Sequence, residues 1–125
     1  MTASTRRNTG PASAAVEAVL ERAQWSCEGC GSEVGDRRGE DWSVHHRRPR
    51  QMGGTRWKGI NLPSNLMILC GSGVTGCHGR TESDRFGGLA SGWLVQSGQD
   101  PAYVKVLIGG SWVYLGNDYK YRVAP

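Results

Sequence analysis

Residues 65–79 read NLMILCGSGVTGCHG, an apolar run followed by a glycine-rich segment with a cysteine at each end. Cys70 and Cys77 are separated by six residues, three of which are glycines. Because glycine adopts backbone conformations closed to other residues, this segment can loop back on itself. The segment therefore predicts a turned loop that brings two thiols to one point.

A second cysteine pair, Cys27 and Cys30, has the spacing of a zinc knuckle, with Gly29 allowing the tight turn between them. Residues 1–10 are polar and contain no apolar stretch like that of a secretory signal, so we expect a cytoplasmic protein. Thiols stay reduced there, and four of them in a small chain favour a metal. We expect one structural Zn²⁺ on Cys27, Cys30, Cys70 and Cys77, with two disulfides or four unpaired thiols as the alternatives.

The chain has 125 residues, enough for one small domain, and its 19 glycines favour a loop-rich α+β fold. We expect a disordered tail over 1–11 and a single domain over 12–125, with a core at 25–88 and a β extension at 89–125. Apolar spacing predicts a helix over 12–24. Short strands are predicted at 42–44, 93–95, 104–108, 111–115 and 119–123. No apolar run is long enough to span a membrane.

Positive charge gathers in residues 37–58, which hold seven of the 15 Lys and Arg residues but only two of the 11 acidic residues. Phosphate backbones attract such a patch, and the arginine fork can bond two phosphate oxygens. A solvated, charged loop is the alternative. The candidate DNA contacts are Arg47, Arg48, Arg50, Arg56 and Lys58.

The three histidines are interleaved with the two cysteine pairs. His45 and His46 are adjacent and follow the predicted strand at 42–44, while His78 directly follows Cys77. Adjacent strand residues point to opposite faces, so one site can use both histidines only where the strand bends or ends. Arg47-Arg48-Pro49 provides such an ending.

This order, Cys27-x2-Cys30, His45-His46, Asn65 and then Cys77-His78, resembles the HNH endonucleases. The resemblance implies a ββα-metal (His-Me finger) core and metal-dependent hydrolysis of DNA to 5′-phosphate and 3′-hydroxyl ends. It makes His46 the general base, a role suited to a side chain that titrates near neutral pH.

The same resemblance implies further site residues. It makes His45 and His78 ligands of a divalent ion (Mg²⁺, Mn²⁺ or Ni²⁺), and Asn65 the residue that orients the base or its loop. Many relatives carry a third histidine on the following helix. This chain has none there, but Glu82 lies four residues after His78 and can supply a carboxylate instead.

The glycine-rich loop is also similar to that of small HNH proteins from actinobacterial phages and prophages, some of which act beside terminase during DNA packaging. That likeness implies DNA and packaging proteins as partners and the host cytoplasm as location. Two other functions stay open. One is a zinc-stabilised nucleic-acid-binding module without catalysis. The other is a protein adaptor with Trp93, Trp112 and Tyr114 on an exposed sheet face.

Overall fold

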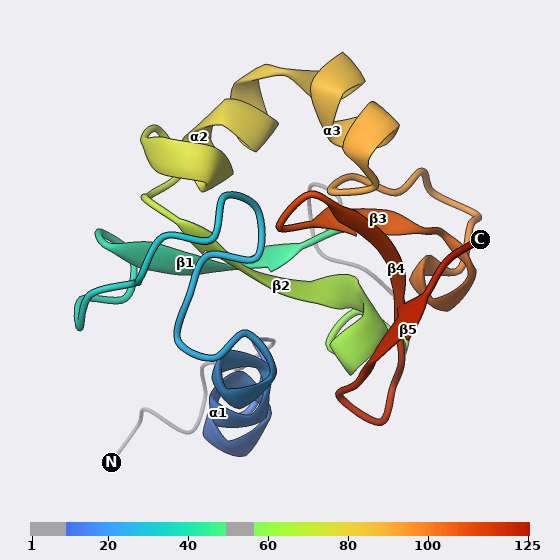
Figure 1. Ribbon diagram of the computed structural model, residues 1–125, viewed down its shortest axis with the longest axis horizontal. Helices are drawn as coiled ribbons and strands as arrows, with labels where there is room; N and C mark the ends of the chain where they lie inside the picture. Colours follow the sequence, from blue (N-terminus) through green and yellow to red (C-terminus); the bar gives the residue numbers. More distant parts are fainter. Residues whose placement is uncertain (1–9, 50–56) are drawn as a thin grey trace, which may run out of the picture.

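The computed structural model describes residues 10–49 and 57–125, which form a mixed α+β architecture (Figure 1). The predicted fold class is therefore confirmed. The elements in chain order are α1 (Ser13–Arg22), β1 (Trp42–His46), the 3₁₀ turn η2 (Pro63–Asn65), β2 (Leu66–Cys70), α2 (Gly76–Ser83), α3 (Arg85–Ser91), the 3₁₀ turn η3 (Pro101–Tyr103), β3 (Val106–Ile108), β4 (Ser111–Leu115) and β5 (Tyr121–Val123).

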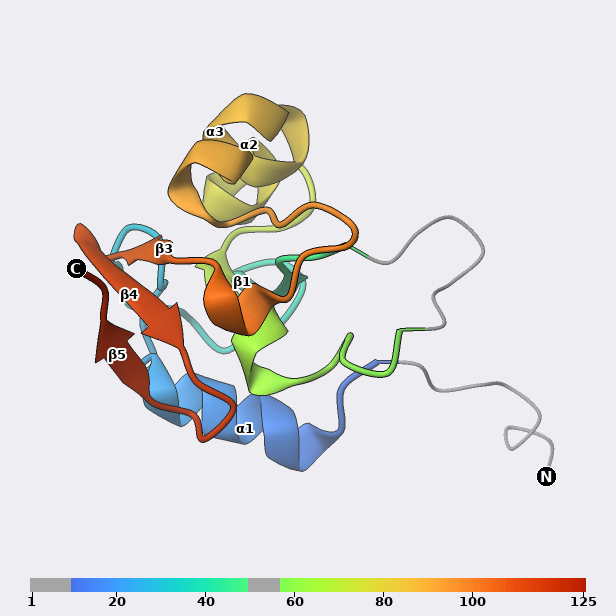
Figure 2. The same ribbon diagram turned by 90° about the vertical axis from the view of Figure 1, so that its right-hand side faces the viewer.

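An antiparallel pair, β1 with β2, lies at the centre of the molecule. Residues 66–69 of β2 are completely buried, because both faces of this strand are covered. Leu66 and Ile68 pack with the apolar face of α1, whereas Met67 and Leu69 pack with Val106 and other residues of the C-terminal sheet. Both views place α1 on one side of the strand pair and the α2–α3 pair on the other (Figures 1 and 2).

The first helix buries Val16, Val19 and Leu20, the stripe that its apolar spacing predicts. It is shorter than predicted and ends at Arg22 rather than at residue 24. The reason is local: Gln24 and Trp25 have φ of 54° and 57°, which is the left-handed region. These two residues turn the chain away from the helix and into the cysteine knuckle.

A buried ion pair joins that helix to the knuckle. Arg22 Nη2 lies 2.8 Å from Glu28 Oε1, and the two side chains are each 1% exposed. Glu28 also accepts hydrogen bonds from the Ile68 amide at 2.8 Å and from the Tyr121 hydroxyl. Because one carboxylate contacts α1, β2 and β5, it ties the knuckle to the rest of the fold.

A three-stranded antiparallel sheet, β3–β4–β5, forms the predicted C-terminal meander. Gly109 and Gly110 turn the chain between β3 and β4 with φ of 53° and 88°, which suits a tight hairpin. The strand predicted over 93–95 is wrong. This segment follows α3, a helix that was not predicted, and its main chain bonds separately to Gly88, Arg47 and His45 instead of joining a ladder.

Arg47 corrects a second prediction, because it is completely buried and has no access to a phosphate. Its guanidinium donates to the carbonyls of Gly92, Ser64, Pro101 and Val104 at 2.7–3.0 Å. These acceptors lie in η2 and in the chain before β3. Arg47 therefore fastens the C-terminal extension to the end of β1.

The predicted tail at 1–11 falls mostly on residues 1–9, which lie outside the described residues, as do Arg50 and Arg56. Within residues 10–49 and 57–125, no helix combines the length and the apolar character that crossing a membrane would require.

Candidate functional site

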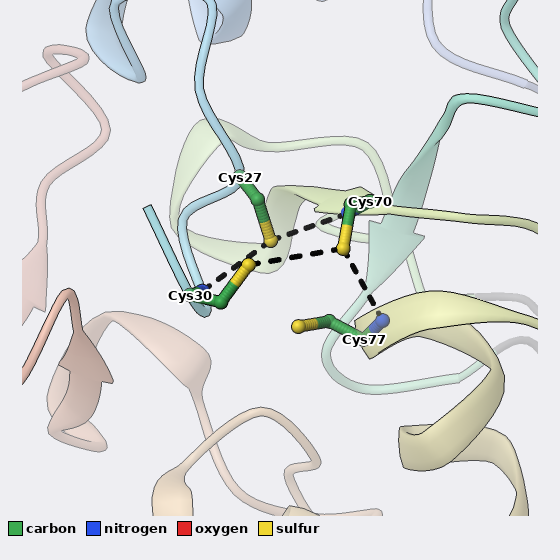
Figure 3. Close-up of side chains that lie close together, drawn as sticks. All are labelled: Cys27, Cys30, Cys70 and Cys77. Atoms are coloured by element: carbon green, nitrogen blue, oxygen red, sulfur yellow. Dashed lines mark hydrogen bonds between the residues drawn. The ribbon is translucent and has the colours of Figure 1, made fainter. Parts of the chain in front are cut away.

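All four cysteines meet where the knuckle, the end of β2 and the start of α2 come together (Figure 3). Their sulfur atoms lie within 4.8 Å of one another, and the Sγ atoms of Cys30 and Cys70 are 3.9 Å apart. The main-chain amides of Cys30 and Cys70 donate to Cys27 Sγ at 3.4 and 3.2 Å. All four are free thiols, so the disulfide alternative is wrong for this structure.

The glycine-rich loop brings the second pair of cysteines into place. Gly71 and Gly76 have φ of 90° and 64°, and a Cβ atom on either would collide with main-chain atoms across the loop. Only glycine fits at these two positions, which is the physical reason for the composition of this segment.

The cysteine cluster fits a tetrahedral Zn²⁺. Four bonds of about 2.3 Å place neighbouring sulfurs about 3.8 Å apart, close to the distance between Cys30 and Cys70. Burial raises the pKa of the Cys27 and Cys77 thiols, whereas a hydrogen bond from the Ser32 hydroxyl lowers the pKa of Cys30 to about 6. Buried thiolates need a compensating cation, and an all-sulfur donor set is one that zinc prefers.

A second donor cluster is formed by His45 on β1 with His78 and Glu82 on α2. One ligand atom from each lies within 4.8 Å of the other two. The imidazole rings of His45 and His78 meet edge to face with centroids 5.4 Å apart. Glu82 is one helical turn after His78, and its Oε1 lies 3.3 Å from His78 Nε2. The structure therefore brings together the three residues predicted to hold the divalent ion.

His45 is held in the form that a metal needs. It is 2% exposed, and burial lowers its pKa to about 4, so the ring is neutral at physiological pH. Its Nε2 lies 2.6 Å from the main-chain oxygen of Trp93. A carbonyl only accepts hydrogen bonds, so Nε2 carries the proton and the lone pair of His45 is on Nδ1.

His78 carries a buried ring nitrogen, Nδ1, that has no hydrogen-bond partner in the described part of the chain. A buried polar atom without a partner is costly unless a ligand satisfies it. The imidazoles of His45 and His78 and the half-exposed carboxylate of Glu82 make a mixed N/O donor set. Such a set fits a divalent cation that retains coordination positions for water and phosphate.

His46 ends β1 and is half-buried beside this cluster. Both adjacent histidines line a cavity of about 360 Å³, together with Val44, Pro49, His78, Glu82 and Leu94. His46 Nε2 lies 2.8 Å from Asn61 Oδ1. Asn61 was not predicted from the sequence. It lies in a loop four residues before Asn65, and the sequence does not predict how that loop folds.

Asn65 is completely buried and acts on the loop between β1 and β2. Its Oδ1 accepts from the Arg48 amide at 2.7 Å, and its Nδ2 donates to the Ile60 carbonyl at 2.9 Å. The side chain thereby closes the two ends of the loop on each other, at the point where His46 and Asn61 meet.

Two of the five predicted DNA contacts remain available among the described residues. Lys58 is exposed, and Arg48 is half-buried with its guanidinium carbon 4.2 Å from the centre of the Trp57 ring. Trp93 lies outside any strand, so the aromatic face predicted for an adaptor lacks one of its three members.

A strand pair followed by a helix, with a sulfur cluster and an imidazole–carboxylate cluster, defines a small metal-binding ββα domain. Residues 27–83, a little under half of the chain, match the family model described as HNH endonuclease. The family resemblance is therefore confirmed, while the likeness to phage proteins stays a prediction. Neither a curated protein nor a solved structure matches the chain.

Proposed function

We propose that this protein is a divalent-metal-dependent endonuclease that hydrolyses DNA phosphodiester bonds and leaves 5′-phosphate and 3′-hydroxyl ends. One observation carries the proposal. His45, His78 and Glu82 offer three ligand atoms within 4.8 Å of one another, and His46 lines the same cavity. The HNH endonuclease match over residues 27–83 supports a nuclease-type function in general.

His45, His78 and Glu82 would hold Mg²⁺, Mn²⁺ or Ni²⁺. When bound, this ion supplies a Lewis acid for the scissile phosphate and for the departing 3′ oxygen. The chain supplies its geometry: β1 fixes His45, and the first two turns of α2 fix His78 and Glu82.

His46 is the general base that takes a proton from the attacking water. Asn61 orients the His46 ring through the contact at Nε2, and Asn65 holds the loop that carries Asn61. A positioned base contributes about 10²–10⁴-fold to a proton-transfer step. Unassisted phosphodiester hydrolysis is so slow that positioning, base and metal together must remove more than ~10 kcal/mol of barrier.

Arg48 and Lys58, with Arg50 and Arg56, bind the phosphates that flank the cut. Contacts of this kind position DNA without reading its sequence. We place the activity in the cytoplasm, where a site of four reduced thiols persists.

The test is plasmid cleavage by purified, zinc-loaded protein with Mg²⁺, Mn²⁺ or Ni²⁺, each with and without EDTA. The proposal predicts nicks or breaks that need the added metal, with 5′ ends that T4 ligase can join without prior phosphorylation. A chain that binds DNA but cuts it under no metal condition would instead be the non-catalytic zinc module.

A further inference from the structure

Trp93 lies ten residues beyond the segment that matches the HNH family, yet its main chain contacts the interior of the site. The contact is the 2.6 Å hydrogen bond from His45 Nε2 to the Trp93 carbonyl. His45 is almost completely buried, so no water competes for this bond. The Trp93 carbonyl therefore determines which nitrogen of His45 keeps a lone pair that can bind an ion.

Several contacts fix that carbonyl in space. The indole Nε1 of Trp93 donates to the Leu107 carbonyl of β3 at 2.8 Å. On either side of Trp93, the Gly92 carbonyl accepts from Arg47 Nε and the Val95 amide donates to the Arg47 carbonyl, both at 2.8 Å. The Trp93 carbonyl is thus held by its own side chain and by the contacts that Gly92 and Val95 make with Arg47.

The Trp93 indole also touches the cysteine knuckle. A Cβ atom on Gly29 would lie 2.5 Å from the Cη2 atom of the Trp93 ring, so the ring edge rests directly on the Gly29 main chain. Gly29 is the residue between Glu28 and Cys30, inside the zinc knuckle. One side chain thus bridges the structural metal site and the carbonyl that orients His45.

We propose that Trp93 is a positioning residue for the catalytic metal: its carbonyl selects the Nδ1 lone pair of His45 for the ion, and its indole transmits the position of the zinc knuckle to that carbonyl. This inference rests on the proposed function for the identity of the ion. Hydrogen-bonded partners of metal-ligating histidines fix tautomer and orientation, and losing them typically weakens metal binding 10–100-fold. The C-terminal extension is in this way a part of the site.

The first test is direct. Long-range ¹H–¹⁵N NMR of the full, zinc-loaded chain reports the tautomer of each of the three histidines, which His→Gln variants assign. At neutral pH without added divalent ion, His45 should carry its proton on Nε2. An Nδ1–H tautomer of His45 in the wild-type protein overturns the proposal.

The second test measures the dissociation constant of Mn²⁺ for the zinc-loaded protein. Trp93→Ala should weaken Mn²⁺ binding 10–100-fold while zinc stays at one per chain. Trp112→Ala is the matched control, a tryptophan on β4 that lies outside the donor cluster, and should bind Mn²⁺ as the wild type does. If Trp93→Ala does not fold, Trp93→Phe removes the indole donor to Leu107 and the ring edge that rests on Gly29, and should weaken binding at least threefold.

Gly29→Ala tests the contact between the cysteine knuckle and the Trp93 ring from the side of the knuckle. Gly29 has no positive φ, so alanine is acceptable to the main chain and the Trp93 ring is the obstacle. Gly29→Ala should weaken Mn²⁺ binding without loss of zinc. In the background of Trp93→Ala, the same change should have no further effect.

If folded Trp93→Ala binds Mn²⁺ with the affinity of the wild type, this inference is overturned, even if the wild type cuts DNA. The same holds for Trp93→Phe if Trp93→Ala does not fold. If the wild type binds Mn²⁺ and replacing Trp93 weakens that binding, but the wild type cuts no DNA, only the proposed function is overturned. A wild type that binds no Mn²⁺ overturns both.

Discussion

The Asn65 side chain bonds both main-chain polar groups of Arg48, accepting from its amide at 2.7 Å and donating to its carbonyl at 3.2 Å. The Asn65 side chain thus makes the two hydrogen bonds to Arg48 that a residue of a neighbouring strand would make. It closes the loop that leaves β1 onto the turn that enters β2. Asn65 therefore closes the loop between β1 and β2, and under the proposed function it would affect the chemistry only through the position of His46.

Asn65→Ala should destabilise the fold by about 2–3 kcal/mol, because it leaves the Arg48 amide and the buried Ile60 carbonyl without their partners. Urea unfolding followed by circular dichroism measures this. Asn117→Ala is the control: it removes a single part-buried hydrogen bond, the one from the Ser64 amide, and should cost about 1 kcal/mol. Equal losses of unfolding free energy in the two variants would contradict this role of Asn65.

The neighbours Arg47 and Arg48 should respond in opposite ways to substitution. Arg47→Met removes the hydrogen bonds to four carbonyls and should destabilise the fold by several kcal/mol, at least about 3. Arg48→Ala should leave the unfolding free energy within about 1 kcal/mol, weaken DNA binding, and lower the slope of log affinity against log salt by about one. Fluorescence anisotropy across a salt series measures the slope. An unchanged slope would mean that Arg48 faces away from DNA.

The cysteine cluster should carry one zinc per chain through extensive dialysis. Cys70→Ala should lose this zinc and unfold, because zinc binding supplies on the order of 10 kcal/mol in small sites of this kind. Ser32→Ala retains all four sulfurs, losing only the hydroxyl contact to Cys30 Sγ, and should keep its zinc. Elemental analysis decides. Zinc-free wild-type protein with two intact disulfides would contradict the zinc site.

His45 should make stability depend on pH in the absence of a divalent ion. Burial lowers its pKa from 6.5 to about 4, so between these values the unfolded chain binds a proton that the folded chain does not. The unfolding free energy should therefore fall by about 3 kcal/mol as the pH is lowered from 6.5 toward 4, and His45 should not make it vary with pH above 6.5. His45→Gln removes this pH dependence, so comparing the unfolding free energies of both proteins across that range isolates it. Parallel pH profiles would contradict a buried, neutral His45.

The sequence predicts the parts of this molecule that depend on short spacings. Two cysteine pairs and a glycine-rich loop predict one sulfur cluster, because the geometry of each pair is local. Glu82 follows His78 by one helical turn, so the donor pair on α2 is also local. The apolar stripe of α1 and the Gly109-Gly110 turn are predictable for the same reason.

The missed features depend on contacts between distant segments. Arg47 reads as part of a basic patch, but acceptors as far along the chain as Val104 draw it into the interior. Trp93 and Val95 have strand propensity, yet their main-chain groups bond to His45 and Arg47 instead of to a neighbouring strand. Asn61 becomes part of the site only because Asn65 folds its loop back.

His46→Ala is the most direct test of the account, because it removes the proposed base and no metal ligand or zinc thiolate. We measure single-turnover cleavage of a plasmid by wild type and variant at saturating Mg²⁺, with zinc content and unfolding free energy as checks on folding. The account predicts a 10²–10⁴-fold slower cut by a folded, zinc-loaded variant. Cleavage by His46→Ala at the wild-type rate, free of contaminating nuclease, would contradict it.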